Sequence, residues 1–340
     1  MDRLTRGAIA GFGEVAARAH LAGWMSRPRI NLGVIFDPVA ERRHEAFRLI
    51  RGVRVYDDFE LMLDGEALDF VDVASPPATH ADLARRALEA GANVIVEKPL
   101  ALSLIDFDDL ARRADARGRV LMCVHNWKFA PPYVVARAAV AEGRIGAVHT
   151  MSFDRLRTEP AGAGGAGTLW RKTAGSGGGI LIDHGWHVFY LMQWLLGGAT
   201  PRSVTARLGF AAGGDADDEA ELEITFDECA ATSRLSWRAD ERRTSAKIVG
   251  ELGRLEIESE RVALVDNRGA AEDLSVADAP DDSYHAPWFA GVATEFEALL
   301  SLGPASEGPR HNLTEARNCI AIIEAARRSA GQGGLKLPIE

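Results

Sequence analysis

The sequence is poor in cysteine and carries fewer basic than acidic residues. Its three cysteines, Cys123, Cys229 and Cys319, stand far apart and include no CxxC pair. This spacing argues against a disulfide framework or a zinc site built from cysteines, so we expect a cytoplasmic protein without metal. The 49 Asp and Glu against 39 Lys and Arg give a formal net charge of −10. Because no basic patch interrupts this excess, we expect no binding to nucleic acid.

Long uninterrupted hydrophobic runs are also missing. Glu14 breaks the apolar stretch near the N-terminus, which therefore does not resemble a secretory signal. The most apolar segment, residues 179–198, contains Asp183, His184 and His187. A carboxylate at the centre of a membrane helix costs roughly 2.5–3.5 kcal/mol, so we expect no membrane span.

The sequence divides into two regions that differ in their pattern of hydrophobic residues. Its 340 residues, 47% of them hydrophobic, are enough for two domains with sizeable cores. Residues 7–122 alternate short β-branched runs with stretches of helical period, which is typical of βαβ units and a doubly wound parallel sheet. The expected strands are residues 8–10, 30–36, 70–74, 93–96 and 121–124.

Beyond residue 125, strand-like runs follow one another without helices between them, which indicates an antiparallel sheet. These runs are residues 147–153, 203–210, 219–226, 231–237, 245–249 and 254–257. Helical stretches at 132–142, 186–196, 287–301 and 312–330 are expected to cover that sheet. The Gly-rich segment 158–168 predicts a mobile loop. We therefore predict an α/β protein with domains at 1–124 and 125–340.

A glycine-rich turn links the first expected strand to a helix. Residues Gly11, Gly13 and Ala16 fit G-x-G-x-x-A. The first Gly permits a tight turn, the second lets the backbone approach a pyrophosphate, and the small Ala lets helix and strand pack closely. The expected phosphate-binding residues are Gly11, Phe12, Gly13, Glu14 and Val15.

Asp37 follows the second expected strand. A carboxylate there would accept hydrogen bonds from the adenosine ribose and repel a 2′-phosphate, which favours NAD over NADP. Two readings compete with this one. Asp37 could simply open a turn with Pro38, and Arg42 and Arg43 could accommodate the additional phosphate of NADP.

Two further turns follow strands at the sheet edge where such folds bind ligands. The first, from Ser75 through Pro76 and Pro77, reaches His80, which either lies beside the nicotinamide or caps a helix starting near residue 81. In the second, an ammonium on Lys98 near the reacting carbon–oxygen bond would favour alkoxide character. The alternative is that Lys98 only forms a surface ion pair with Glu97.

These motifs, in this order, resemble the Gfo/Idh/MocA family of nicotinamide-dependent oxidoreductases. Further segments match in sequence order: 125–129, 170–171, 177–187, 248–253 and the closing helix 312–330. The resemblance implies a Rossmann domain followed by an α+β domain. Its open, mainly antiparallel sheet often mediates homo-oligomers, here a homodimer or homotetramer. It also implies hydride transfer between NAD and a secondary alcohol or ketone of a sugar, polyol or inositol-like substrate.

The resemblance makes Lys98, Asp183 and His187 the expected catalytic residues. Asp183 and His187 are four residues apart, so in a helix they share a face. In relatives that oxidise sugars or inositols, the matching His is the base and the Asp holds substrate and imidazole. A His beside aromatic residues can instead be purely structural, and that is how we interpret His184.

The chain departs from the family pattern at two positions. Tyr190 stands where many members carry Asp, and Lys128 stands where Arg is common. The second change replaces a planar guanidinium, which can form two parallel hydrogen bonds, by a compact ammonium. Asn126, directly after a strand, could hold a substrate hydroxyl or a carboxamide. Trp170 and Arg171 either reach the cofactor or substrate, or serve packing and surface charge.

The expected cofactor-binding residues beyond the glycine turn are Asp37, Arg42, Ser75, Pro76, Pro77, His80, Glu97, Lys98, Asn126, Trp170 and Arg171. The expected substrate-binding residues are Lys98, Asn126, Lys128, Asp183, His187 and Tyr190. Two other functions remain open: a glycosidase that uses NAD transiently, and a silent dinucleotide-binding regulator. The proton-transfer residues argue against the regulator.

Overall fold

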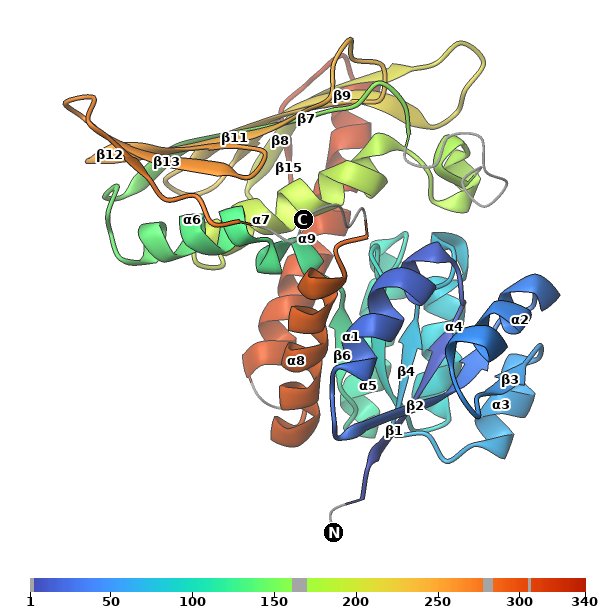
Figure 1. The fold of residues 1–340 in the computed structure, drawn as a ribbon. Coiled ribbons are helices and arrows are strands. Elements are labelled where there is room, and N and C mark those ends of the chain that lie inside the picture. Colours follow the sequence, from blue (N-terminus) through green and yellow to red (C-terminus); the bar gives the residue numbers. More distant parts are fainter. Residues whose placement is uncertain (1–2, 161–169, 278–283, 305–306) are drawn as a thin grey trace. The chain divides into compact units, whose positions relative to one another are not determined.

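The computed structural model describes residues 3–160, 170–277, 284–304 and 307–340. The chain forms two compact units, each made of two segments. Unit 1 contains Met1–Phe129 and Ala279–Ala316, and unit 2 contains Ala130–Asp278 and Arg317–Glu340. Figure 1 shows the elements of both.

Unit 1 is built on a six-stranded sheet in the order β3-β2-β1-β4-β5-β6. All of its strand pairs are parallel. The strands are β1 (Thr5–Ala10), β2 (Ile30–Phe36), β3 (Arg54–Tyr56), β4 (Phe70–Val73), β5 (Asn93–Val96) and β6 (Leu121–Cys123). The order reverses between β1 and β4, so the predicted doubly wound sheet is confirmed, with its switch point beside β1.

The helices of unit 1 begin and end at recognisable signals. Pro77 occupies the first turn of α4 (Pro77–Glu89). Ser103 caps α5 (Leu104–Arg117) by accepting from the Asp106 N–H at 3.1 Å, and Gly118 ends it in the left-handed region. The other helices are η1 (Ala16–His20), α1 (Leu21–Met25), α2 (Ala40–Leu49), α3 (Phe59–Gly65), η2 (Asn126–Phe129) and α8 (Ala286–Leu302).

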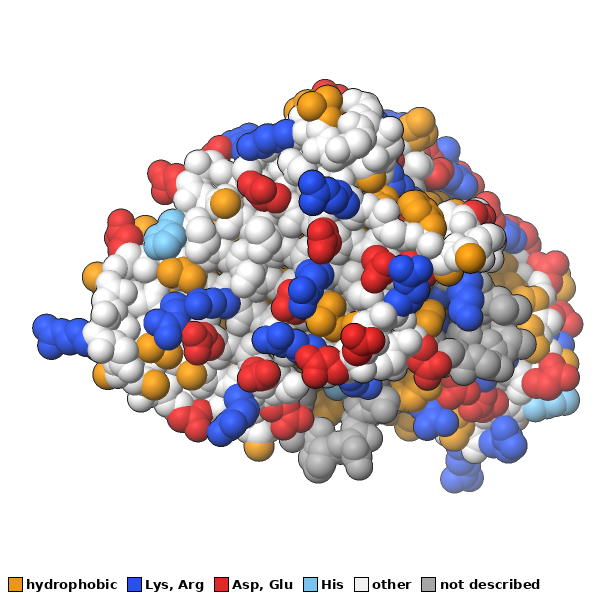
Figure 2. Space-filling view, turned by 90° about the horizontal axis from the view of Figure 1, so that it is seen from above, with side chains coloured by type: hydrophobic (Ala, Val, Ile, Leu, Met, Phe, Trp, Pro, Cys, Tyr) orange, Lys and Arg blue, Asp and Glu red, His pale blue; other side chains and the backbone are white. Residues whose placement is uncertain are grey.

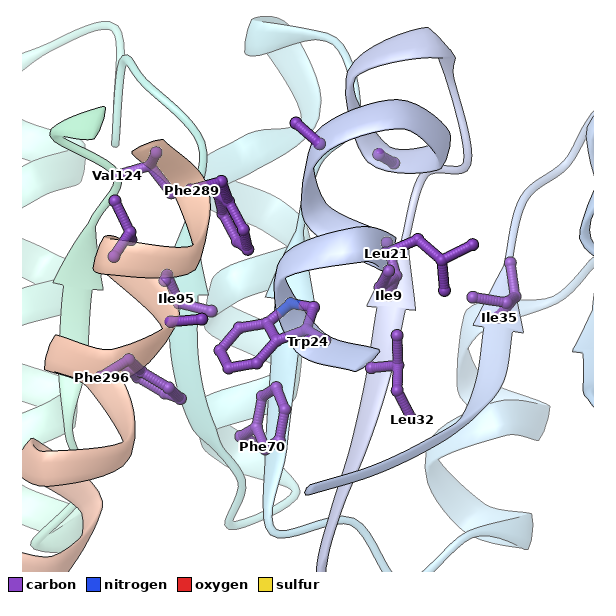
Figure 3. Close-up of a cluster of buried hydrophobic side chains, with 14 of the residues drawn as sticks. Ile9, Leu21, Trp24, Leu32, Ile35, Phe70, Ile95, Val124, Phe289 and Phe296 are labelled. Atoms are coloured by element: carbon purple, nitrogen blue, oxygen red, sulfur yellow. The ribbon is translucent and has the colours of Figure 1, made fainter. Parts of the chain in front are cut away.

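The position of α8 differs from the expectation that it covers the second sheet. Its residues lie in unit 1, where Phe289 and Phe296 pack against Trp24 with ring centroids 5.6 and 5.9 Å away. Trp24 also meets Phe70 of β4 at 4.9 Å, and all four side chains are buried (Figure 3). The cause is hydrophobic, because short α1 alone leaves this side of the parallel sheet to be covered. The two units therefore do not coincide with residues 1–124 and 125–340.

Unit 2 contains a nine-stranded sheet in the order β14-β13-β12-β11-β7-β10-β9-β8-β15. Among the strand pairs that the structure describes in this sheet, β7–β10 is parallel and the others are antiparallel, so the predicted mainly antiparallel sheet is confirmed. The strands are β7 (Val148–Leu156), β8 (Ser203–Phe210), β9 (Asp217–Thr225), β10 (Ala230–Ser236), β11 (Arg243–Gly250), β12 (Gly253–Glu258), β13 (Arg261–Asp266), β14 (Ala271–Asp273) and β15 (Leu337–Pro338).

One face of this sheet is buried and the other is exposed. On β7, Met151 and Phe153 are buried while Thr150 and Ser152 are exposed, as the period of two requires. The helices of unit 2 include α6 (Pro131–Ala141), η4 (Ala174–Ser176), η5 (Leu181–Gly185), α7 (Trp186–Leu195) and part of α9 (Glu307–Gly331).

Residues 161–168 of the Gly-rich loop lie outside the described residues. Among the helices that are described, none is both long and apolar enough to cross a bilayer.

Candidate active site

The glycine turn after β1 has the shape that its sequence predicts. Gly11 adopts a φ of +94°, and a Cβ there would lie 2.6 Å from the Ser75 Cα. At Gly13, by contrast, an added Cβ would meet nothing within 4 Å. The first glycine is thus required by the fold, whereas the second leaves open space beside the backbone. Space of this kind fits the close approach of a dinucleotide pyrophosphate to the helix start.

Asp37 is buried and holds this turn in place. Its Oδ2 accepts the Phe12 N–H at 2.7 Å, and its Oδ1 accepts the Val39 N–H at 2.8 Å. A carboxylate oxygen can accept more than one hydrogen bond, so both oxygens retain capacity for ribose hydroxyls. Asp37 is therefore more than a turn opener, because it connects the carboxyl end of β2 to the glycine turn.

The arginines near Asp37 are engaged with acidic or backbone groups. Arg42 pairs with Glu14 at 3.3 Å and with Glu45 at 3.2 Å. The Arg43 guanidinium donates to the Asp37 carbonyl at 2.8 Å. Side-chain hydrogen bonds from Arg18 and Arg42 lower the pKa of Glu14. Accepting a 2′-phosphate on Arg42 would mean breaking these ion pairs, which agrees with the preference for NAD.

His80 lies in the first turn of α4 rather than before it. Its ring is buried between two backbone carbonyls, with Nδ1 2.7 Å from Pro99 O and Nε2 2.7 Å from Ser75 O. Burial lowers the pKa of His80, although both carbonyls oppose that effect. His80 thus connects the turn after β4 to the turn after β5, and Pro76 and Pro77 begin the helix between them.

Lys98 follows Glu97 at the carboxyl end of β5 and is half-buried. The Glu97 carboxylate does not act only as a surface ion-pair partner for Lys98. Its Oε2 accepts the Lys98 backbone N–H at 2.8 Å, and its Oε1 lies 3.1 Å from His20 Nε2. Burial would raise the pKa of Glu97, but the His20 hydrogen bond and the Lys98 charge outweigh it and lower that pKa.

Sequence reasoning missed the partners behind Glu97. His20 Nδ1 lies 2.8 Å from Asp72 Oδ2, and the Trp24 indole N–H donates to the same oxygen at 2.6 Å. His20 and Asp72 are both 0% exposed. The only signal for this pair was that a histidine and an aspartate each stand in an otherwise apolar segment. A charged group buried in such a segment requires a partner.

Asn126 and Lys128 occupy η2, after β6. The Oδ1 atom of Asn126 is buried and accepts no hydrogen bond within the described residues. Such an acceptor costs free energy unless a ligand donates to it, so Asn126 fits its expected binding role. Lys128 pairs with the buried Glu315 of α9, whose carboxylate also lies 3.3 Å from His125 Nδ1. Burial would raise the pKa of Glu315, but His125 and Lys128 outweigh it and lower that pKa.

In unit 2, a second glycine turn leads into η5. A Cβ on Gly178 would lie 2.3 Å from Trp170 O, and Gly179 has a φ of +111°. Asp217 accepts the Leu181 N–H at 2.8 Å and pairs with Arg327 at 3.2 Å. Asp217 therefore anchors the start of η5, a role for which the sequence analysis gave no expectation.

This turn positions Asp183 beside Arg171. The Arg171 Nε donates to Asp183 Oδ2 at 3.0 Å, and its guanidinium lies 4.5 Å from the centre of the Trp170 ring. Asp183 is 4% exposed, so the contact with Arg171 compensates a buried charge. Trp170, Arg171 and Asp183 are thus together, and Arg171 serves the carboxylate rather than surface charge alone.

His187 and Tyr190 form a pair in the first turns of α7. His187 Nδ1 lies 2.9 Å from the Tyr190 hydroxyl, and the two side chains are 7% and 0% exposed. The phenol that replaces the family's carboxylate therefore contacts the candidate base. His184 lies 3.9 Å from Asp183 Oδ2 and edge-on to Trp237, in agreement with a structural role. Across the described residues, no cluster of His, Cys, Asp and Glu suits a metal ion.

Comparison with protein families gives two matches. Residues 5–125 match an oxidoreductase family with an NAD-binding Rossmann fold. Residues 133–256 match the GFO/IDH/MocA C-terminal domain.

Individual relatives extend the likeness over the whole length. A D-apiose dehydrogenase of Paraburkholderia graminis is 27% identical, over 96% of this chain and 88% of the relative. A D-glucoside 3-dehydrogenase of Escherichia coli is 30% identical, over 59% of this chain and 56% of the relative. Among solved structures, GenD2 from gentamicin A biosynthesis, in complex with NAD, has 27% identity and a TM-score of 0.83, covering 100% of this chain and 97% of the other.

An inositol dehydrogenase homolog from Azotobacter vinelandii, complexed with NADH and myo-inositol, shares the fold. Its TM-score is 0.83 at 20% identity, covering 99% of this chain and 98% of the other.

Proposed function

This chain belongs to the GFO/IDH/MocA family of oxidoreductases, and from that premise we propose that it is an NAD-dependent dehydrogenase of a sugar, polyol or inositol-like compound. The observation that carries the proposal is the pairing of a dinucleotide turn on β1 with a half-buried Lys98 at the carboxyl end of β5. Both lie at the sheet edge where doubly wound folds bind their ligands.

The residues of unit 1 fit NAD. The open space at Gly13 admits a pyrophosphate, Asp37 has capacity for ribose hydroxyls, and Asn126 has a buried acceptor that fits a carboxamide N–H or a substrate hydroxyl. When bound, NAD would supply the hydride acceptor for alcohol oxidation.

We assign charge stabilisation, proton transfer and the orientation of the substrate to three side chains. The Lys98 ammonium stabilises negative charge on the reacting oxygen. His187 accepts the hydroxyl proton on Nε2, which requires that Nδ1 carry a proton and donate it to Tyr190 Oη. Asp183, fixed by Arg171, accepts a neighbouring substrate hydroxyl. Lys128, bound to Glu315, and Tyr190 complete the substrate contacts that we propose.

The first test is a thermal-shift titration with NAD, NADH, NADP and NADPH, followed by a panel of polyols and sugars read at the NADH absorbance. We expect NAD and NADH to stabilise by about 2.7 kcal/mol at one hundred times the dissociation constant. Apiose, glucosides and scyllo-inositol head the panel, because relatives are named for them. Release of an aglycone from a glycoside without NADH would replace the dehydrogenase by an NAD-using glycosidase.

The residue-level test is Lys98→Met. We expect kcat to fall by about 10³-fold while the NAD-induced shift stays unchanged, because loss of one electrostatic stabiliser costs on the order of 3–4 kcal/mol in the transition state. The matched control is Lys336→Met, which removes an exposed lysine directly before β15. Wild-type turnover in Lys98→Met would remove the assignment.

We also propose that two copies associate through the exposed face of the nine-stranded sheet, in the cytoplasm. Figure 2 shows a face with broad pale areas and with Lys and Arg beside Asp and Glu. Across the strands, Lys247, Ser152, Thr232 and Glu223 are neighbours in register and point to this exposed side. Small hydroxyl side chains between opposite charges suit a self-complementary contact.

All three cysteines are buried thiols, which suits the proposed location in a reducing compartment, the cytoplasm.

A further inference from the structure

Three arginines gather at one end of the nine-stranded sheet of unit 2. Arg155 lies on β7 two residues after the buried Phe153, so the period of two places both on the same face of the sheet. Arg157 directly follows β7, and its backbone N–H continues the ladder by donating to Ser236 O at 2.8 Å. Arg242 directly precedes β11, the strand that pairs with β7 on its other side.

A shared hydroxyl group holds the first two arginines side by side. Thr244 of β11 lies opposite Arg155 in the register of the two strands. Its Oγ1 accepts from Arg155 Nη1 at 2.5 Å and from Arg157 Nη2 at 3.1 Å. Two positive charges therefore meet at one neutral acceptor. Like charges held this close repel each other unless an anion lies beside them.

The charges of the three arginines act on one another. Burial, together with the charges of Arg157 and Arg242 and against the opposing effect of Tyr133, lowers the pKa of Arg155 to about 9. Burial and the charge of Arg242 likewise lower the pKa of Arg157 to about 10. Both guanidinium groups remain protonated at neutral pH. Within the part of the chain that the structure describes, no carboxylate forms an ion pair with Arg157 or Arg242.

The guanidinium of Arg157 retains donors for a ligand. Of its five N–H donors, those on Nη1 serve the carbonyls of Leu156 at 2.7 Å and Arg243 at 3.0 Å, and one on Nη2 serves Thr244. The Nε–H and a second Nη2–H meet no acceptor among the described residues. Donors on two nitrogens of one planar group form a fork that matches two oxygens of a carboxylate or a phosphate.

The arginine cluster lies beside the segment that leads into the candidate base. Leu235 of β10 is in register with Arg155. A Cβ on Gly185, the last residue of η5, would lie 3.2 Å from Leu235 Cδ1, so η5 packs on β10 next to the arginines. The charge of Asp183, also in η5, opposes the effect of burial on the pKa of Arg157. The cluster and the proposed substrate-binding aspartate are therefore neighbours within unit 2.

We infer that Arg155, Arg157 and Arg242 bind an anionic group of the substrate, a carboxylate or a phosphate, so that the substrate is an acidic derivative of a sugar or polyol. This assignment rests on the proposed function for the reaction and adds the class of substrate. The anion would occupy the fork of Arg157 and offset the repulsion among the three cations. A neutral sugar would leave that repulsion in place.

The primary experiment measures anion binding without turnover. Phenylglyoxal modifies guanidinium groups, and peptide mapping by mass spectrometry gives its rate at Arg157 and Arg242 relative to the exposed Arg328 of α9. NAD is present throughout, so that the dinucleotide turn does not compete for the anion. We expect inorganic phosphate or D-gluconate to lower the relative rates at both arginines at least about threefold, and the neutral counterpart D-sorbitol to leave them unchanged.

The second experiment compares substrates that differ in an anionic group. The panel is extended by the pairs sorbitol and gluconate, galactose and galacturonate, and glucose and glucose 6-phosphate. We expect one anionic member to have a kcat/KM at least about 10-fold above that of its neutral partner, because hydrogen bonds to a charged group are the stronger ones. A gain confined to carboxylates or to phosphates identifies which anion the cluster takes.

Substitutions of the cluster test the same assignment. In Arg157→Gln we expect kcat/KM for the anionic compound to fall by about 10- to 100-fold, mainly through KM, with NAD affinity unchanged. Arg157→Lys retains the charge without the fork and should recover part of this loss. Arg242→Gln changes an exposed side chain and should act in the same direction, which covers the case that Arg157→Gln does not fold. Arg328→Gln is the matched control and should have no effect.

The outcomes separate the anion site from the proposed function. Modification rates at Arg157 and Arg242 that neither phosphate nor gluconate changes overturn the inference, whatever the activity. Protection by an anion without oxidation of any compound supports the anion site and rejects the dehydrogenase. Oxidation of neutral compounds as efficiently as their anionic partners retains the dehydrogenase and overturns the inference.

Discussion

At the scale of single residues, the candidate site residues are held by hydrogen bonds with neighbouring side chains or backbone groups. Asp37 holds the Phe12 N–H, Arg171 holds Asp183, and Tyr190 contacts His187. In each case a residue that could serve a ligand is itself oriented by a neighbour at 3.0 Å or less. Supporting hydrogen bonds of this kind hold the site residues in position before a substrate binds.

The charge of His20 predicts a pH dependence of stability. Burial alone would lower its pKa, but Asp72 and Glu97 outweigh it and raise that pKa from 6.5 to about 9 on folding. Its stabilising contribution is therefore full below pH 6.5 and is lost as pH rises through 9. We expect the free energy of unfolding of wild type, relative to His20→Leu, to decline by roughly 3 kcal/mol over that interval. Urea denaturation at pH 6, 7.5 and 9.5 measures it. A constant difference would show that His20 is neutral.

The contacts of Asp37 predict that its replacement changes both the stability of the protein and its preference for NAD over NADP. Replacing it by Ala leaves two backbone N–H groups without their acceptor, which we expect to cost about 1–3 kcal/mol. NAD affinity should fall at least tenfold. NADP affinity should fall less, because the same change removes a charge that repels the 2′-phosphate. Fluorescence titration with both cofactors tests this, and an equal loss for both would contradict the proposed selectivity.

At the scale of elements, the two glycine turns show how local backbone geometry places the site. The turn after β1 and the turn before η5 each contain one glycine with positive φ, Gly11 and Gly179. In both, an added Cβ would collide with the part of the protein that the turn packs against. A strand–turn–helix unit can bring backbone this close only where a side chain is absent.

The first turn offers a matched pair of substitutions. Gly11→Ala should cost at least about 2 kcal/mol, because it forces a positive φ on a residue with Cβ and collides with the Ser75 backbone at 2.6 Å. Gly13→Ala should leave stability within about 0.5 kcal/mol, since its Cβ enters open space, and should still weaken NAD binding severalfold. Thermal denaturation with and without NAD separates the two effects. Equal destabilisation by both would contradict the assigned geometry.

At the scale of the whole molecule, segments distant in sequence complete each unit. Residues 284–302 return to unit 1, where Phe289 meets His20 and Phe296 meets Trp24. The C-terminal β15 pairs with β8, which belongs to the other segment of unit 2.

The exposed sheet face predicts the oligomeric state. Thr232 is exposed and lies in register with Ser152 and Glu223. We expect Thr232→Lys to shift sedimentation toward the monomer, because two equivalent lysines would approach each other across a two-fold axis. The control, Arg112→Lys, changes an exposed residue of α5. A wild type that sediments as a monomer would reject the interface.

Many of the elements and the local motifs were predictable from the sequence alone. Hydrophobic periodicity marked β1, β2, β4 and β5, and it marked α8 and α9 as helices. The glycine spacing, Asp37 and the Glu97-Lys98 turn were legible because their chemistry depends on residues adjacent in the chain or one strand apart.

Which sheet a helix covers, and which buried charged groups meet, depend on the tertiary structure. Periodicity shows that α8 has an apolar face but not what that face packs against, so its place in unit 1 could not be read. The same holds for His20, whose partners Asp72 and Glu97 are 52 and 77 residues away. A contact at such separation has no local signature, because it is fixed by strand order and side-chain packing.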